Sequence, residues 1–226
     1  MKFAGDNHKG ESFLHKPEVW FRSKLIPLVP KWIETNHLTL MTIIWSILVI
    51  VFGFLALGDI RWLWGVCALI VVQYITDILD GQIGKVRNTG LVKWGYYMDH
   101  FLDYVFICAM LSSLFIVLPT ESNLYMLAVL VLFGSFMVSS FLSFSAKNEF
   151  QITYAKVGPT ELRILFILVF VLLIFLGPTF MVVGLPYFVA VATLVLIGHT
   201  YIVQKSIWKI DMDNKKRNEG EQIPKE

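Results

Sequence analysis

The chain has 226 residues, of which 56% are hydrophobic and only 16% are charged. This composition is too apolar for a soluble domain of this length and indicates an integral membrane protein. The formal net charge of +2 is small, and we expect no nucleic-acid partner. Cys67 and Cys108 lie inside apolar runs and are interpreted as small buried hydrophobic residues, which argues against a disulfide or metal framework.

The first 36 residues are mixed and charged, and we expect neither a cleavable signal peptide nor a membrane span within them. Residues 16–36 combine aromatic and basic side chains at a density typical of a segment lying in the lipid headgroup layer. Pro27 and Pro30 predict two short helical pieces in place of one helix. An ordinary soluble linker is the alternative. Residues 1–36 are therefore predicted to form an interfacial N-terminal segment.

Six apolar stretches follow, and each is long enough to cross a bilayer, since a helical span needs about 20 residues. The sequence thus predicts an all-α integral membrane protein in which residues 37–204 form the membrane domain. The charged tail, residues 205–226, lacks apolar periodicity toward its end, and we expect no regular structure there. The predicted spans are 38–57, 62–80, 96–118, 122–146, 162–180 and 182–203.

Basic residues predict the orientation of these spans. Six Lys and Arg residues lie before residue 36, three lie in residues 81–95, three in residues 147–163 and six after residue 203. Arg61 alone lies at the opposite ends of the spans. The positive-inside rule therefore places both termini and both long loops in the cytoplasm. The membrane would be the cell membrane of a bacterium or the endoplasmic reticulum of a eukaryote.

Four aspartates gather near the cytoplasmic ends of the second and third predicted spans. Asp77 and Asp80 are spaced i, i+3, and Asp99 and Asp103 are spaced i, i+4, so each pair shares one helix face. We expect the two helices to be adjacent and antiparallel and to direct all four carboxylates at one place. An aspartate at the centre of a membrane helix costs about 2.5–3.5 kcal/mol, and neighbouring carboxylates repel one another. These two spans carry no Lys or Arg on that face as a partner.

Divalent cations would neutralise such a cluster. They bind carboxylate oxygens, and four negative charges match two ions such as Mg²⁺ or Mn²⁺. Two metal ions at one site suit phosphoryl transfer, because both the attacking and the leaving oxygen need charge stabilisation. Helix caps or water-facing aspartates are the alternative interpretation. A cation transporter is a remote alternative, because it predicts carboxylates near the bilayer midplane and repeated halves.

Glycines and basic residues accompany the aspartates. Gly81, Gly84 and Gly95 continue the two acidic helix faces, and backbone without side chains lets a bulky phosphorylated ligand approach closely. Lys85 and Arg87 can bind anionic oxygens that the metal ions do not cover. The sequence therefore predicts a site for a phosphorylated ligand at the cytoplasmic edge of the membrane.

Residues 77–103 read DILDGQIGKVRNTGLVKWGYYMDHFLD. They resemble the signature of the CDP-alcohol phosphotransferase, or phosphatidyltransferase, family: D-x2-D-G-x2-A-R, a spacer of about eight residues, and G-x3-D-x3-D. The predicted spans and the interfacial segment agree with this family, so the resemblance covers most of the chain. Two features depart from the pattern: Gly84-Lys85 stands where the family has Ala-Arg, and the spacer has nine residues. Lys keeps the charge of Arg without its planar fork, and Arg87 could take over part of its role.

The resemblance implies cleavage of the pyrophosphate of a CDP-linked alcohol, transfer of the substituted phosphate to an acceptor hydroxyl, and release of CMP. By this resemblance Asp77, Asp80 and Asp99 would bind metal, and Asp103 would bind a second metal or act as the general base. Thr39, in the sequence NHLT, is similar to a position near the cytidine in many members. A helix N-cap is the alternative role for this residue.

His100 and Glu161 resemble the choline/ethanolamine phosphotransferase branch. That branch implies a CDP-choline or CDP-ethanolamine donor and a diacylglycerol acceptor, with the His–Glu pair as the base for the acceptor hydroxyl. An imidazole can accept this proton at neutral pH. In the alternative interpretation His100 bonds a neighbour or a lipid headgroup, and Glu161 is a favourable acid in the first turn of a helix.

The other branch uses a CDP-diacylglycerol donor with a small polar acceptor such as inositol, serine or glycerol phosphate. A phosphorylated acceptor, inositol phosphate included, would need a basic pocket, for which Lys147, Lys156 and Arg163 are available. Small residues in the fourth span could line a close helix contact and support a homodimer. These are Gly134, Ser135, Ser139 and Ser140.

Overall fold

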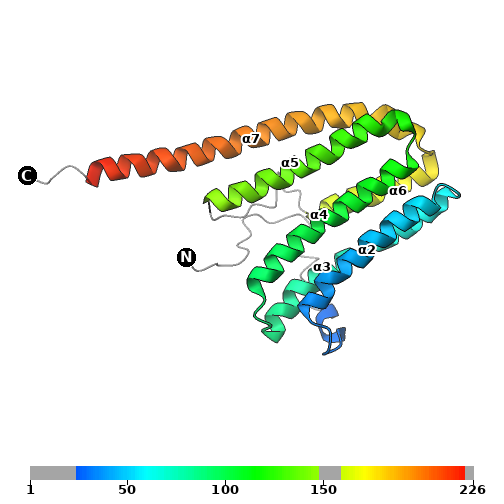
Figure 1. Ribbon diagram of the computed structural model, residues 1–226, viewed down its shortest axis with the longest axis horizontal. Helices are drawn as coiled ribbons and strands as arrows, with labels where there is room; N and C mark the ends of the chain where they lie inside the picture. The colour runs from blue at the N-terminus through cyan, green and yellow to red at the C-terminus, as the bar shows by residue number, and fades with distance from the viewer. Residues whose placement is uncertain (1–23, 148–158, 222–226) are drawn as a thin grey trace, which may run out of the picture.

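The computed structural model describes residues 24–147 and 159–221, and every regular element in these ranges is helical (Figure 1). Five of the helices are long and apolar enough to cross a membrane, which confirms an all-α membrane protein. A further helix, α6, is shorter and is not among these five. The α-helices are α2 (Thr35–Leu55), α3 (Leu63–Arg87), α4 (Val92–Val117), α5 (Asn123–Lys147), α6 (Pro159–Leu176) and α7 (Thr179–Glu221), and short 3₁₀ turns lie at η1 (Ile26–Leu28), η2 (Ile60–Trp62) and η3 (Thr120–Ser122).

Helix α2 packs along both α3 and α4, whereas α3 and α4 contact each other little. We expected the two helices that carry the aspartates, α3 and α4, to pack directly against each other. Each of them packs mainly against α2 instead. A close approach of backbones explains the α2–α4 contact: a Cβ atom on Gly53 would lie 2.6 Å from the Ser113 hydroxyl oxygen and 3.0 Å from its Cα. Small residues at such crossings are typical of membrane helices.

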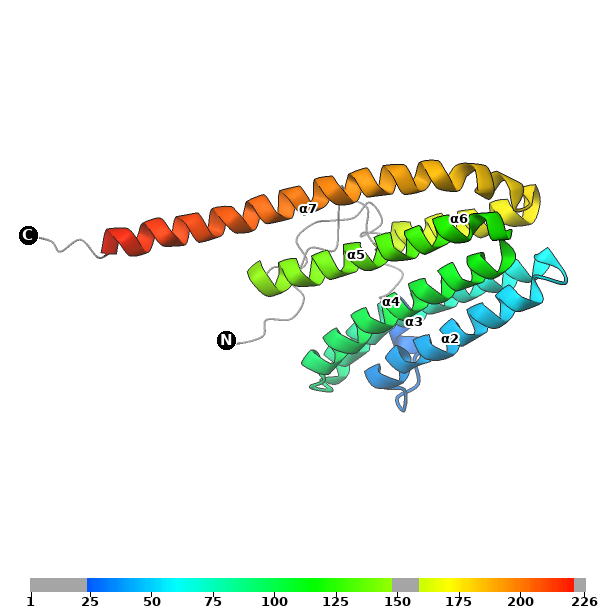
Figure 2. The ribbon, with the colours of Figure 1, turned by 45° about the horizontal axis from the view of Figure 1, so that its top comes forward.

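The remaining helices cover this three-helix unit. Helix α6 packs against α3, and α5 packs against α7 (Figures 1 and 2). Gly134 of α5 faces α4, where a Cβ atom on this glycine would lie 3.2 Å from the Tyr104 hydroxyl oxygen. The Ser139 hydroxyl lies 3.1 Å from the His199 Nε2 atom of α7. Two of the small residues that we considered for a dimer contact thus face neighbouring helices of the same chain.

Two helices extend well beyond the spans predicted from the sequence. Helix α3 continues to Arg87, seven residues past the predicted end of the second span at residue 80, so the first half of the expected connection is helical. Helix α7 has 43 residues and continues to Glu221, which corrects the expectation that the tail lacks regular structure. At 1.5 Å per residue it is about 65 Å long, roughly twice the thickness of the hydrocarbon core. No proline or glycine interrupts it between Gly198 and Gly220.

A small apolar cluster lies at the end of the bundle that carries the aspartates. Its buried members come from α2 and α3, and side chains of residues 25–33 pack against it. On the same segment, Leu28 and Trp32 are each 75% exposed. One side of the segment therefore covers the helix ends and the other presents apolar side chains outward, as expected at a membrane interface. Residues 16–23 of the predicted interfacial segment lie outside the described residues.

Candidate functional site

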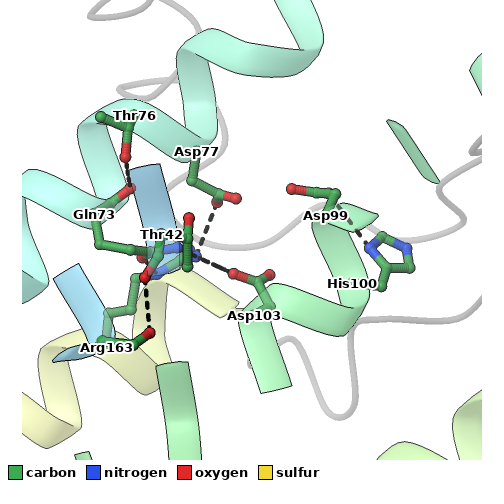
Figure 3. A network of polar contacts seen from close by, with 9 residues as sticks. Thr42, Gln73, Thr76, Asp77, Asp99, His100, Asp103 and Arg163 are labelled. Carbon is green, nitrogen blue, oxygen red and sulfur yellow. Dashed lines mark hydrogen bonds and ion pairs between the residues drawn. The ribbon is translucent and has the colours of Figure 1, made fainter. Parts of the chain in front are cut away.

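The four predicted aspartates lie close together at one end of the bundle. Asp77 and Asp80 belong to α3, and Asp99 and Asp103 belong to α4. Coulombic interactions connect the four carboxylates to one another. Figure 3 shows the carboxylates of Asp77, Asp99 and Asp103 directed toward a common region between the helices. The structure thus brings together the residues on which the sequence-based site depends.

Arg163 of α6 enters this acidic cluster. Its Nη2 atom donates to Asp77 Oδ2 at 2.8 Å and to Asp103 Oδ1 at 3.1 Å (Figure 3). The side chain is 11% exposed. The sequence suggested Arg163 only as part of a basic pocket for an acceptor phosphate, and the structure places it between two of the aspartates. A guanidinium bonded to two partly buried carboxylates offsets part of their mutual repulsion.

Gln73 completes the contact between α3, α4 and α6, and sequence analysis missed it. It is fully buried. Its Oε1 accepts from Arg163 Nε at 3.0 Å, while its Nε2 donates to Asp103 Oδ1 at 3.1 Å. Gln73 lies one helical turn before Asp77 on α3 and therefore shares its face. A buried amide in a membrane helix, in register with an aspartate, was the signal that could have identified it.

Asp80 has different partners, and they come from α2. Asp80 is 5% exposed, and its Oδ2 accepts a short hydrogen bond from the Thr39 hydroxyl. Thr35 donates its hydroxyl to the Asp80 backbone carbonyl at 3.1 Å. Thr39 is therefore part of the site. The resemblance suggested a position near the cytidine, and in the structure its hydroxyl is bonded to an aspartate. The N-cap position of α2 is occupied by Glu34, which rules out that alternative role for Thr39.

His100 lies beside Asp99 at the start of α4. Its Nδ1 atom is 3.3 Å from Asp99 Oδ2. The imidazole is buried, and its ring packs against Tyr96 at 4.6 Å and Phe141 at 6.0 Å between centroids. Packing on two sides fixes the ring orientation next to the acidic cluster. Glu161 lies in the first turn of α6, two residues before Arg163.

The two basic residues at the end of α3 have separate environments. Lys85 is exposed. Arg87 is bonded to the N-terminal segment: its guanidinium donates to the backbone carbonyls of Ile33, Val29 and Pro30, the last two at 3.0 and 3.1 Å. The Pro30 carbonyl also accepts from the Ile33 backbone N–H at 3.1 Å, so Arg87 adds to the hydrogen bonds of this turn and ties the segment to α3. Of the two, only Lys85 has its charged group available for a ligand without breaking such bonds.

The three glycines also differ in their surroundings. A Cβ atom on Gly81 or Gly95 would meet no heavy atom of residues 24–147 or 159–221 within 4 Å. A Cβ on Gly84 would lie 2.8 Å from the Thr35 hydroxyl oxygen. Open space beside Gly81 and Gly95 agrees with the predicted approach of a ligand, whereas Gly84 allows α2 to approach α3.

The residues of the site can be compared with the needs of divalent cations. Within residues 24–147 and 159–221, no three His, Cys, Asp or Glu side chains converge closely enough to hold a metal ion. The guanidinium of Arg163 lies between Asp77 and Asp103 instead. The donor set itself, four carboxylates directed at one region, has the oxygen chemistry that Mg²⁺ and Mn²⁺ prefer. The carboxylates therefore fit such ions in chemical type, and in the described arrangement Asp77 and Asp103 are bonded to Arg163 instead.

The fold and site define a helical membrane protein with a polar, carboxylate-rich site at one end of its bundle, of a kind suited to phosphoryl transfer. A family model for CDP-alcohol phosphatidyltransferases matches residues 32–200, and the chain belongs to this family. A search of curated proteins finds no relative that matches this chain. Membership makes the protein a membrane-embedded transferase of phosphate-containing groups that uses a CDP-linked alcohol in phospholipid synthesis.

Proposed function

We propose that the protein transfers the substituted phosphate of a CDP-choline-type or CDP-ethanolamine-type donor to the hydroxyl of diacylglycerol and releases CMP. The observation that carries this choice is the buried imidazole of His100, held between two aromatic rings and next to Asp99. Any acceptor hydroxyl needs a base for its proton, and in the choline/ethanolamine branch that this sequence resembles, a histidine at this place in the signature would serve the hydroxyl of diacylglycerol. A fixed imidazole beside the acidic site meets this need.

In this proposal Asp77, Asp80, Asp99 and Asp103 hold two divalent cations, Mg²⁺ or Mn²⁺. When bound, the ions would neutralise the charge of the pyrophosphate and of the departing CMP. The protein supplies the carboxylates and keeps them in place, through Thr39 for Asp80 and through Gln73 for Asp103. Such supporting hydrogen bonds orient metal ligands and strengthen metal binding.

The donor would lie over the helix surface at Gly81 and Gly95, where the described side chains leave room for it. Lys85, exposed at the end of α3, would bind an anionic oxygen of the donor. The acceptor oxygen attacks the phosphorus that carries the choline or ethanolamine group, and the bond from this phosphorus to the bridging oxygen breaks. The electrons of that bond leave with CMP, and the proton of the acceptor hydroxyl passes to His100. Glu161 would support the imidazole, and Asp103 is the alternative base.

The alternative is a CDP-diacylglycerol donor with a small polar acceptor. A phosphorylated acceptor would need free basic groups, yet Arg163 is bonded to two aspartates and to Gln73. Lys147 ends α5, and Lys156 lies outside the described residues. In the described arrangement Arg163 is therefore engaged by the site itself and is not available to an acceptor phosphate.

The deciding experiment measures CMP release by purified protein with Mg²⁺ or Mn²⁺ and two sets of substrates. One set pairs CDP-choline or CDP-ethanolamine with diacylglycerol, and the other pairs CDP-diacylglycerol with inositol, serine, glycerol phosphate or inositol phosphate. Turnover with the first set supports the proposal. Turnover with only the second set reverses the donor assignment, and His100 then becomes a structural residue.

We further propose six spans, with α6 as the fifth in chain order, and a cytoplasmic site with both termini on the same side. The basic residues Lys85, Lys147 and Lys205 lie at helix ends near the acidic site or just beyond the last apolar stretch, as the positive-inside rule requires. A homodimer would have to use surfaces other than the contacts made by Gly134 and Ser139 within the chain. Labelling of single cysteines at residues 61 and 85 in intact cells tests the orientation, since only the former should react from outside.

A further inference from the structure

Arg163 and a divalent cation would compete for the position between Asp77 and Asp103. The guanidinium binds Asp77 Oδ2 and Asp103 Oδ1 through one nitrogen, Nη2. These two oxygen atoms belong to α3 and α4, and Arg163 itself belongs to α6. A cation that bridges these two oxygen atoms would occupy the place of Nη2, and the positive charges of the ion and the guanidinium would repel each other there.

The contacts around Arg163 indicate how a cation could replace the guanidinium at the two aspartates without leaving the guanidinium without polar partners. Its Nε bonds to Gln73, and its guanidinium carbon lies 5.7 Å from the centre of the Tyr74 ring. Both partners are neutral. A guanidinium that gives up the two aspartates could keep a hydrogen bond to the amide and a cation–π contact to the ring. Gln73 Nε2 would still support Asp103.

We propose that Arg163 is the resident counter-ion of the metal-free site, and that divalent cations bind by displacing its guanidinium from Asp77 and Asp103. The inference rests on the divalent-cation site of the proposed function. Its consequence is that Arg163 lowers the affinity of the site for metal while stabilising the protein without metal. Because Arg163 lies on α6, metal binding also alters the contacts of the first turns of this helix with α3.

Binding of Mn²⁺ to purified full-length protein in detergent, followed by electron paramagnetic resonance of the free ion, tests the inference without turnover. We expect Arg163→Gln to bind Mn²⁺ about tenfold more tightly or better, because binding no longer includes displacement of a cation. Without metal, the same variant should unfold at a lower temperature than wild type. Added Mn²⁺ should raise its unfolding temperature by more than that of wild type.

Arg61→Gln is the matched control. Arg61 lies before α3, at the end of the bundle opposite the aspartates, where it pairs with Asp59 at 2.7 Å. The hydrogen bond from Arg61 holds the pKa of Asp59 below its usual value. This variant removes the same charge from an ion pair but should leave Mn²⁺ affinity unchanged.

Three results would overturn the inference. Unchanged or weaker Mn²⁺ binding by Arg163→Gln, with normal binding by wild type, would refute displacement while leaving the proposed metal site intact. Absence of Mn²⁺ binding in wild type and in Arg163→Gln alike would remove the metal site and the inference together. If Arg163→Gln does not fold, hydrogen exchange of the wild-type protein tests the inference instead. Mn²⁺ should then alter the exchange of residues 160–166 and leave the exchange of the α5–α7 contact unchanged. No change in residues 160–166 would refute displacement.

Discussion

Replacing Thr39 with valine tests how the site holds Asp80. The substitution keeps the shape of the side chain and removes the hydroxyl that donates to Asp80 Oδ2. Asp80 is 5% exposed, so water cannot replace this donor freely. A hydrogen bond to a charged group contributes about 1.5–3 kcal/mol. Residues that orient metal ligands in this way typically change metal affinity or activity by about 10–100-fold.

We therefore expect Thr39→Val to lower metal-dependent CMP release by about 10–100-fold. The loss should appear as a higher concentration of Mn²⁺ needed for half-maximal rate, because Asp80 is a metal ligand in the proposed function. The apparent KM for the CDP donor, measured at saturating Mn²⁺, should stay close to that of wild type. Thr39→Ser keeps the hydroxyl and should retain most of the activity.

Thr42→Val is the matched control, since Thr42 is also buried on α2, one turn further along. No contact between its hydroxyl and a carboxylate is seen in the described part of the chain, and we expect nearly normal metal dependence. If Thr39→Val instead raised the KM for the donor and left the Mn²⁺ requirement unchanged, Thr39 would contact the nucleotide, as the family resemblance suggested. The orienting role for Asp80 would then be refuted.

Three further substitutions test other parts of the site. Asp99→Asn should abolish CMP release while the protein stays folded, and near-normal turnover would contradict its role as a metal ligand. His100→Ala should slow transfer by about 100-fold or more if the imidazole is the base, whereas a loss of less than about tenfold returns that role to Asp103. Arg87→Gln should loosen residues 25–33, detected as faster proteolysis there, and should leave the KM for the donor unchanged; a raised KM with normal proteolysis would show that Arg87 binds phosphate.

The acidic cluster could be predicted because the residues that define it lie close together in the sequence. The spacing within each aspartate pair fixes one face of one helix, and a short connection brings the two pairs to the same end of the bundle. The apolar length of the spans follows equally directly from composition. Asp77, Asp80, Asp99 and Asp103 consequently meet in the structure as the sequence suggested.

The partners of these aspartates could not be predicted in the same way. Arg163 is 86 residues from Asp77 and 60 from Asp103, and nothing in the local pattern of α6 states which helix it faces. The position of α2 between α3 and α4 depends on small residues such as Gly53 and on its fit to Ser113. Arg87 illustrates the same limit. Its position near an acidic site suggested a contact with the ligand, but its guanidinium donates to backbone carbonyls of the N-terminal segment. Long-range packing decides each of these contacts.

The four carboxylates are consequently unequal, although their sequence pattern treats them alike. Asp80 is supported by a neutral hydroxyl, Asp77 and Asp103 by a guanidinium, and Asp99 lies beside an imidazole. With all four ionised, Arg163 alone leaves a formal excess of three negative charges in a largely buried site. One arginine therefore holds the helices together without satisfying the site, and the remaining charge still favours divalent cations. In this proposal Arg163 stabilises the protein in the absence of metal. The three uncompensated carboxylates still bind divalent cations, which then displace the arginine.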